Sequence, residues 1–180
     1  MKHLFLLRHA KSGWDDPQAR DFDRRLNARG TRGAVTMGRY LKAERLRFDH
    51  VLASDAARVT ETITGVEQGY GAPLHAVWER RIYLASASAL IDLVNALPDS
   101  AGSALMVGHN PGLEDLVLQL VPDDAADAAR AAVYDKFPTA ALAEITFDID
   151  RWDQVARGTG RLARFIRPRD LDPALGPDAD

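Results

Sequence analysis

Short apolar runs that alternate with amphipathic segments are the feature that most restricts how this chain can fold. Three runs have the length and composition of buried strands: 4–7, 50–53 and 104–107. Between them, apolar residues recur at helical spacing in three segments: 31–44, 59–66 and 88–97. Strands and helices that alternate in this way predict an α/β fold, with a mostly parallel central sheet and helices on both faces.

The alternation continues through the second half of the chain. A helix is expected after the third run, with Asn110 suited to the N-cap and Pro111 to the first helical position. Gly69 and Gly71 are expected to end the helix that contains 59–66. Further elements are expected as follows: a short strand within 74–78, a helix within 123–132, and strands at 141–147 and 161–166.

The length of 180 residues suits one compact domain, which we place at residues 1–168. Residues 169–180 contain two prolines and several aspartates, so we expect them to form a poorly ordered tail. No coiled-coil heptads or long unassigned apolar stripe remain, and we therefore expect a monomer.

Composition excludes several classes of function. The net charge of −3 and the interspersed acidic residues argue against a nucleic-acid partner. The chain has no cysteine, which rules out disulfides, thiolate metal sites and cysteine nucleophiles. No apolar run is long enough for a signal-peptide core or a membrane span, so we expect a cytoplasmic protein without a membrane partner.

Basic side chains follow each of the three main strands. The first strand leads directly into Arg8 and His9, the second is followed by Arg58 near a helix start, and the third leads into His109. In an open parallel sheet, ligands bind beyond the carboxyl ends of the strands. These four residues are therefore expected to converge on one anion pocket, for which phosphate is the obvious occupant.

Each of the four residues has a chemical part to play at a phosphate. Arg8 and Arg58 can each offer parallel donors to phosphate oxygens, and their charge opposes protonation of a nearby imidazole. His9 is then neutral and can attack phosphorus, giving a phosphohistidine that water cleaves later. His109 would contact the transferring oxygens. The cluster neutralises charge without a metal, and no metal-binding histidine spacing is present.

Taken singly, these residues also have ordinary structural explanations. Arg58 could lie on a helix surface, and 108–112 could be only a turn and a helix start. The functional hypothesis depends on all four falling at equivalent strand ends.

Several segments in order resemble a known family. They are 6–12 (Leu-Leu-Arg-His-Ala-Lys-Ser), 21–26, 29–30, 54–62, 107–114, 136–141 and 168–171. The chain resembles the histidine phosphatase superfamily, and within it the SixA-type phosphohistidine phosphatases. The resemblance implies a phosphoglycerate mutase-like three-layer sandwich that needs no metal or cofactor. It also implies a catalytic His9, phosphate-binding Arg8 and Arg58, and His109 as the second histidine.

Other positions are less clear from the resemblance. Superfamily members usually place a glutamate proton donor after the third strand, where this chain has Glu79, but a surface carboxylate paired with Arg80 or Arg81 is an equal alternative. Ser12 is a candidate phosphate ligand. Asp15 stands where many members have an amide, and we expect it to point elsewhere or to be protonated.

The function expected from these observations is hydrolysis of phosphohistidine on a signalling or phosphotransfer protein. An imidazole departs more readily than an alkoxide, and the short segment between Arg58 and His109 leaves no room for a large cap. Two alternatives stay open: a phosphomonoesterase that acts on a small phosphorylated metabolite, and a phosphate-binding module without catalysis.

Overall fold

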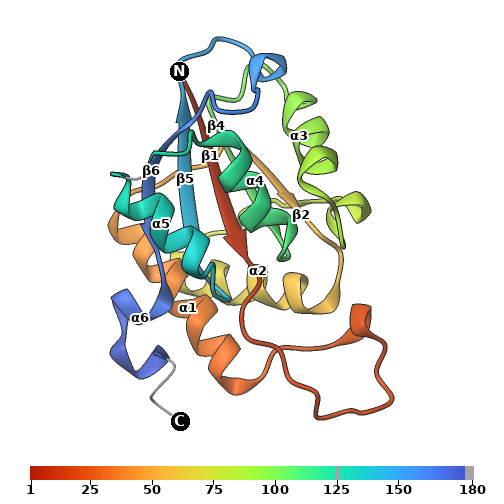
Figure 1. Ribbon diagram of the computed structural model, residues 1–180. Coiled ribbons are helices and arrows are strands. Elements are labelled where there is room, and N and C mark those ends of the chain that lie inside the picture. The colour runs from red at the N-terminus through yellow and green to blue at the C-terminus, as the bar shows by residue number, and fades with distance from the viewer. Residues whose placement is uncertain (125, 177–180) are drawn as a thin grey trace.

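The computed structural model describes residues 1–124 and 126–176 and contains one sheet with helices on both faces (Figure 1). The six strands are β1 (Lys2–Arg8), β2 (His50–Ala53), β3 (Val77–Trp78), β4 (Ser103–Gly108), β5 (Leu142–Phe147) and β6 (Arg161–Ile166). Their order in the sheet is β3-β2-β4-β1-β5-β6. Parallel pairing joins β3, β2, β4 and β1, whereas β5 runs antiparallel to β1 and β6. The predicted mostly parallel sheet is confirmed.

The helices are distributed over the two faces of the sheet. Their bounds are α1 (Ala28–Ala43), α2 (Ala57–Tyr70), α3 (Ala87–Asn95), α4 (Gly112–Leu120), α5 (Ala128–Asp135) and α6 (Pro168–Leu171). Single 3-10 turns lie at Asp21–Asp23, Arg80–Ile82, Trp152–Gln154 and Pro173–Leu175. Helices α1 and α2 pack together behind the sheet, while α3, α4 and α5 lie in front of it in Figure 1.

Strand β1 shows why the apolar runs form the centre of the molecule. Its side chains alternate between the two faces, so Leu4 and Leu6 join the core beneath α3 and α4, whereas Phe5 and Leu7 join the core beneath α1 and α2. All four are buried, and each contributes about 1.5–3 kcal/mol through removal from water. This burial fixes the register that brings Arg8 opposite Gly108 on β4.

Helices α1 and α2 approach each other at backbone contact through glycines. A Cβ atom on Gly69 would lie 2.1 Å from the carbonyl oxygen of Val35, and one on Gly38 would lie 2.1 Å from that of Val66. Gly69 is the residue before the last in α2 and does not end it, contrary to expectation. The helix ends at Gly71, which adopts a φ of 82°.

The start of α4 also differs from the prediction. The helix begins at Gly112, and Pro111 occupies the N-cap position expected for Asn110. The Asn110 amide instead donates to Glu114 Oε2 at 3.1 Å and to the Phe137 carbonyl at 3.0 Å. Its side chain thus ties α4 to the segment before β5.

The prediction of a poorly ordered tail is wrong for residues 169–176. This segment forms α6, which packs on α1, and the turn at Pro173–Leu175. Leu175 is buried, and Arg29 on α1 donates to the Gly176 carbonyl. The rest of the expected tail, 177–180, lies outside the described residues.

None of the described helices combines the length and the apolar character needed to cross a bilayer.

Candidate active site

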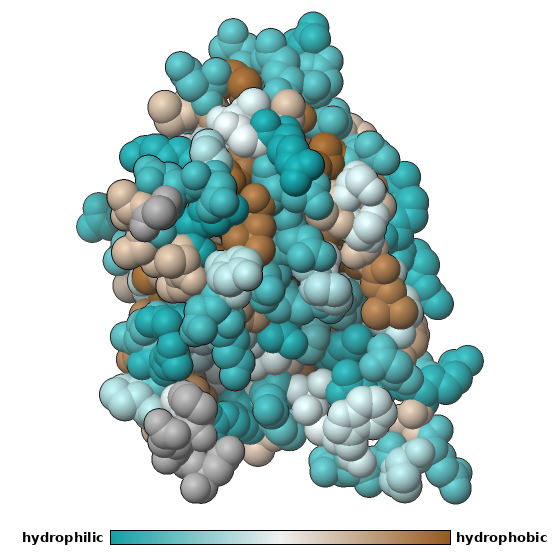
Figure 2. Space-filling view, in the orientation of Figure 1, coloured by the Kyte–Doolittle hydropathy of each residue, from teal (hydrophilic) through white to brown (hydrophobic). Residues whose placement is uncertain are grey.

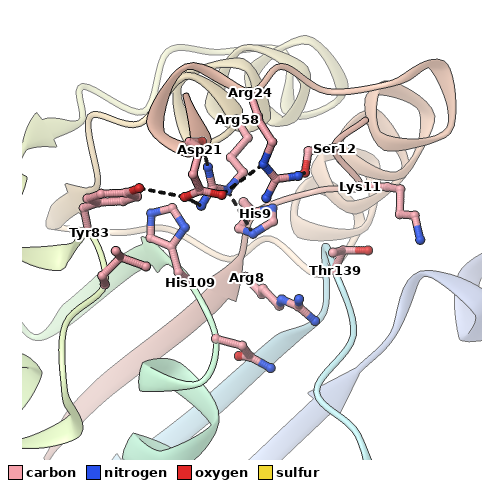
Figure 3. A pocket seen from close by; sticks show the side chains of 12 residues that line it. Arg8, His9, Lys11, Ser12, Asp21, Arg24, Arg58, Tyr83, His109 and Thr139 are labelled. Carbon is pink, nitrogen blue, oxygen red and sulfur yellow. Dashed lines mark hydrogen bonds and ion pairs between the residues drawn. The ribbon is translucent and has the colours of Figure 1, made fainter. Parts of the chain in front are cut away.

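A cavity of about 500 Å³ opens at the carboxyl ends of β1, β2 and β4 (Figure 3). The structure brings together all four residues predicted from the strand ends: Arg8, His9, Arg58 and His109. Arg8 and His109 lie at one edge of the sheet because β1 and β4 pair in parallel register. Arg58 comes from the first turn of α2, which follows β2.

His9 has the protonation state that an attacking imidazole needs. Its Nδ1 is 2.7 Å from the Ala10 carbonyl oxygen, which can only accept, so the hydrogen lies on Nδ1 and Nε2 carries the lone pair. Burial lowers the pKa of His9 to about 3, and the nearby charges of Arg8 and Arg58 act in the same direction. The ring is therefore neutral at physiological pH.

The two arginines supply fixed positive charge beside this ring. Arg58 is buried and its Nε lies 3.4 Å from His9 Nε2. Arg8 donates from Nη1 to the Phe137 carbonyl at 2.9 Å, and its buried Nε has no hydrogen-bond partner among the described residues. Burial lowers the pKa of Arg8, but a guanidinium stays protonated in a protein. Both groups can therefore neutralise a phosphate dianion.

His109 completes the floor of the cavity. Its ring centroid is 5.3 Å from that of His9, and its Nε2 is 2.8 Å from the Ser54 hydroxyl. Burial first, and then the charge of Arg58, lower the pKa of His109 to about 4. His109 is thus neutral in the free site, and a bound dianion would raise its pKa and favour the donating form.

Comparisons with known proteins agree with this geometry. Residues 4–80 match the histidine phosphatase superfamily (branch 1). The SixA protein of Agrobacterium tumefaciens is 30% identical, with a TM-score of 0.77 over 93% of this chain and 98% of that one. The SixA protein of Nakamurella multipartitia is 25% identical, with a TM-score of 0.80 over 93% of this chain and 96% of that one. This chain belongs to the histidine phosphatase superfamily.

An uncharacterised protein of Mycobacterium tuberculosis is a further relative of this histidine phosphatase. It is 35% identical over 164 residues, which span 91% of this chain and 100% of that protein. The full-length matches to SixA proteins assign the chain to the SixA type, and the family indicates a phosphatase.

Asp21 is a cavity residue of this histidine phosphatase that sequence reasoning missed. Its carboxylate accepts hydrogen bonds from Tyr83 Oη at 2.6 Å, Arg24 Nε at 3.0 Å and Arg58 Nη2 at 3.1 Å (Figure 3). The bond from Tyr83, together with those from the two arginines, lowers the pKa of Asp21 to about 2. The only signal in the sequence was that 21–26 is one of the family-like segments.

Other residues of the lining were also not predicted as site residues: Lys11, Arg24, Tyr83, Leu84, Asn110 and Thr139. Ser12, which was predicted, lines the cavity and accepts from Arg24 Nη1 at 2.8 Å. Its role as a phosphate ligand stays a prediction. Asp15 is exposed and lies outside the lining, so it points elsewhere, as expected.

Glu79 does not have the features of a proton donor. It lies outside the cavity lining, and its carboxylate accepts from Arg81 Nε at 2.9 Å and Arg81 Nη2 at 2.8 Å. These bonds lower the pKa of Glu79 to about 2, so it is ionised at neutral pH. The structure thus favours the alternative in which Glu79 is a carboxylate paired with a neighbouring arginine.

Proposed function

We propose that this phosphatase hydrolyses phosphohistidine on a protein through a phosphohistidine intermediate on His9. The observation that carries the proposal is that no protonated carboxylic acid lines the described part of the cavity to serve an ester leaving group. Among the described residues that line the cavity, Asp21 is the sole carboxylic side chain, and its pKa of about 2 leaves it ionised. An alkoxide leaving group needs a general acid, whereas a phosphohistidine ring that already carries a proton on its other nitrogen leaves as neutral imidazole without one.

The first step is attack of the His9 Nε2 lone pair on phosphorus. The substrate reacts in the form whose other ring nitrogen carries a proton. Its phosphorus–nitrogen bond breaks, the electron pair returns to the ring nitrogen that carried the phosphoryl group, and the ring departs as neutral imidazole with its proton on the other nitrogen. Arg8 and Arg58 neutralise the phosphoryl oxygens during the transfer, because phosphoryl transfer depends mainly on positioning and charge. His109 donates a hydrogen bond to one of these oxygens.

The second step regenerates the enzyme. Water attacks the phosphorus bound to His9, the bond to Nε2 breaks, and phosphate leaves with the oxygen and protons of that water. The hydrogen bond from Nδ1 to Ala10 keeps the same nitrogen of the ring facing the cavity throughout.

Two peptides of one sequence test the proposal, one carrying phosphohistidine and the other phosphoserine at the same position. We expect kcat/KM to be at least about 100-fold higher on the phosphohistidine peptide, which is the usual contribution of a general acid that the ester lacks here. Equal or faster cleavage of phosphoserine would support the metabolite phosphomonoesterase instead. Binding of phosphohistidine without turnover would support the non-catalytic module.

A further inference from the structure

A second hollow, which we call the basic groove, adjoins the catalytic cavity. It has a volume of about 370 Å³ and shares Arg8, Lys11 and Thr139 with the cavity. Its walls come from the loop after β1, the start of α1, the segment before β5 and the start of α6. A molecule held at His9 can therefore extend into the basic groove without leaving the surface.

The lining of the basic groove is strongly cationic. Ten of the described residues line it, and six of these are basic and none is acidic; the basic ones are Arg8, Lys11, Arg29, Lys136, Arg167 and Arg169. The whole chain carries a net charge of −3, so this concentration of positive charge is local to the groove. Figure 2 shows that hydrophilic side chains predominate at the end of the molecule where α6 and the loop after β1 lie.

Three of these cations are available to a partner. Over residues 1–124 and 126–176, the side chains of Lys11, Lys136 and Arg169 make no hydrogen bond and no ion pair. All three are exposed. Arg167, by contrast, is held by Asp170 at 2.9 Å. An incoming carboxylate would gain new ion pairs with Lys11, Lys136 and Arg169 without first displacing internal ones.

Exposed apolar side chains at and near the adjoining catalytic cavity favour a protein over a small polyanion. Leu84 lines the catalytic cavity and is 68% exposed, and Trp14, on the loop after β1, is 66% exposed. The ring of Trp14 stacks on Arg24, whose guanidinium carbon is 4.0 Å from the ring centroid. Leu84 thus lies in the cavity that adjoins the groove, and Trp14 contacts a residue of that cavity; large exposed apolar side chains near a charged site are typical of a protein-binding surface.

We propose that the basic groove binds an acidic segment of the same phosphoprotein whose phosphohistidine enters the catalytic cavity. The inference rests on the proposed function, because it specifies the substrate as a phosphohistidine close to a run of aspartate or glutamate. The cations of the groove attract and orient that segment, and the phosphate group binds at His9.

The kinetic test uses two chemically phosphorylated histidine peptides that differ only in flanking residues, four glutamates in one and four glutamines in the other. We expect the wild type to prefer the glutamate peptide by about tenfold at low ionic strength. The double variant Lys136→Glu with Arg169→Glu should lose this preference and keep its kcat/KM on the glutamine peptide. Neither position lines the catalytic cavity.

A matched control is available at the other end of β6. Arg157 and Arg161 are exposed, and Arg157→Glu with Arg161→Glu makes the same change in net charge. This control should keep the preference, as should Lys136→Arg with Arg169→Lys. Equal kcat/KM on both peptides in the wild type, or equal losses in the test and control variants, would overturn the proposal.

A binding measurement separates failure of the groove from failure of the proposed function. Fluorescence anisotropy with the labelled, unphosphorylated glutamate peptide reports on the groove without any catalysis. We expect binding that weakens as salt rises from about 0.05 to about 0.5 M and that the double variant loses. Inorganic triphosphate is the small-polyanion probe. If the double variant loses binding of triphosphate, and the peptide does not bind to the groove, a protein partner is contradicted. If neither probe binds the wild type more tightly than the double variant, the groove is not a binding site.

Discussion

Arg58 donates to Asp21 twice, from Nη1 to the backbone carbonyl at 2.6 Å and from Nη2 to Oδ2 at 3.1 Å. The guanidinium beside His9 is thus oriented by the loop that follows β1. The same carboxylate places a negative charge within the pocket that must receive a phosphate dianion. Asp21 therefore holds Arg58 in position, and under the proposed function its charge would also oppose binding of the phosphate dianion.

Replacement of this carboxylate by an amide separates its two effects. Asp21→Asn keeps one acceptor oxygen, which can serve the bonds from Tyr83 and Arg58 that share Oδ2, but it loses the bond from Arg24 and the charge. We therefore expect inorganic phosphate to inhibit about three- to tenfold more tightly. The inhibition constant against a phosphohistidine peptide measures this. Asp23→Asn is the control, because Asp23 pairs with Arg20 at the surface. Weaker inhibition in Asp21→Asn would mean that the orientation of Arg58 outweighs the repulsion.

The two histidines predict how stability depends on pH. The pKa of His9 is lowered to about 3 and that of His109 to about 4. In the unfolded chain each histidine has its ordinary pKa of about 6.5. Between that pH and the lowered pKa values, the unfolded chain binds more protons than the folded protein. The free energy of unfolding therefore falls as pH drops below about 6.5. We expect at most about 1.4 kcal/mol per pH unit from each histidine.

Urea unfolding from pH 7 to pH 4 measures this dependence. His109→Gln should show a shallower loss of unfolding free energy than the wild type over that range. His75→Gln is the control, because His75 is exposed and lies outside the cavity. An identical slope in all three proteins would contradict the lowered pKa of His109.

Glu79→Gln should leave the chemistry nearly unchanged. The carboxylate pairs with Arg81 and lies outside the cavity lining, so we expect kcat on phosphohistidine to change by less than about twofold and stability by less than about 1 kcal/mol. Arg81→Gln, which breaks the same pair from the other side, should match it in both measurements. A loss of about 100-fold in kcat in Glu79→Gln alone would restore Glu79 as the general acid.

The contact between α1 and α2 predicts opposite effects for two glycines of one helix. Gly38→Ala forces a Cβ to within 2.1 Å of the Val66 carbonyl oxygen and should destabilise by about 1–3 kcal/mol. Gly33→Ala places its Cβ 3.7 Å from that of Ala140, an ordinary contact, and should be neutral or stabilise by about 0.5–1 kcal/mol. Thermal unfolding of both variants checks this. Equal effects would show that the helices can move apart at no cost.

The strands and the four basic residues could be predicted because they depend on local pattern and on one topological rule. The buried run Leu4–Leu7 predicted β1, and the parallel register then brought Arg8 and His109 to one edge of the sheet. The position of Arg58 followed from the helix after β2.

Features that depend on packing between distant segments could not be predicted in this way. Asp21 lies in a polar loop, and its partners Arg58 and Tyr83 stand 37 and 62 residues away. Gly69 is a helix terminator by local rules, but contact with α1 places it inside α2. The pairing of Glu79 with Arg81 was foreseen only as one of two alternatives, because sequence does not give the direction of a side chain.

Trapping of the phosphorylated enzyme tests the central claim most directly. The protein is mixed with a phosphohistidine peptide labelled with radioactive phosphorus, quenched at alkaline pH within milliseconds, and digested for mapping. We predict acid-labile label on His9, and none in His9→Ala. Label on another residue, or turnover of the peptide without labelled enzyme at any quench time, would contradict attack by His9.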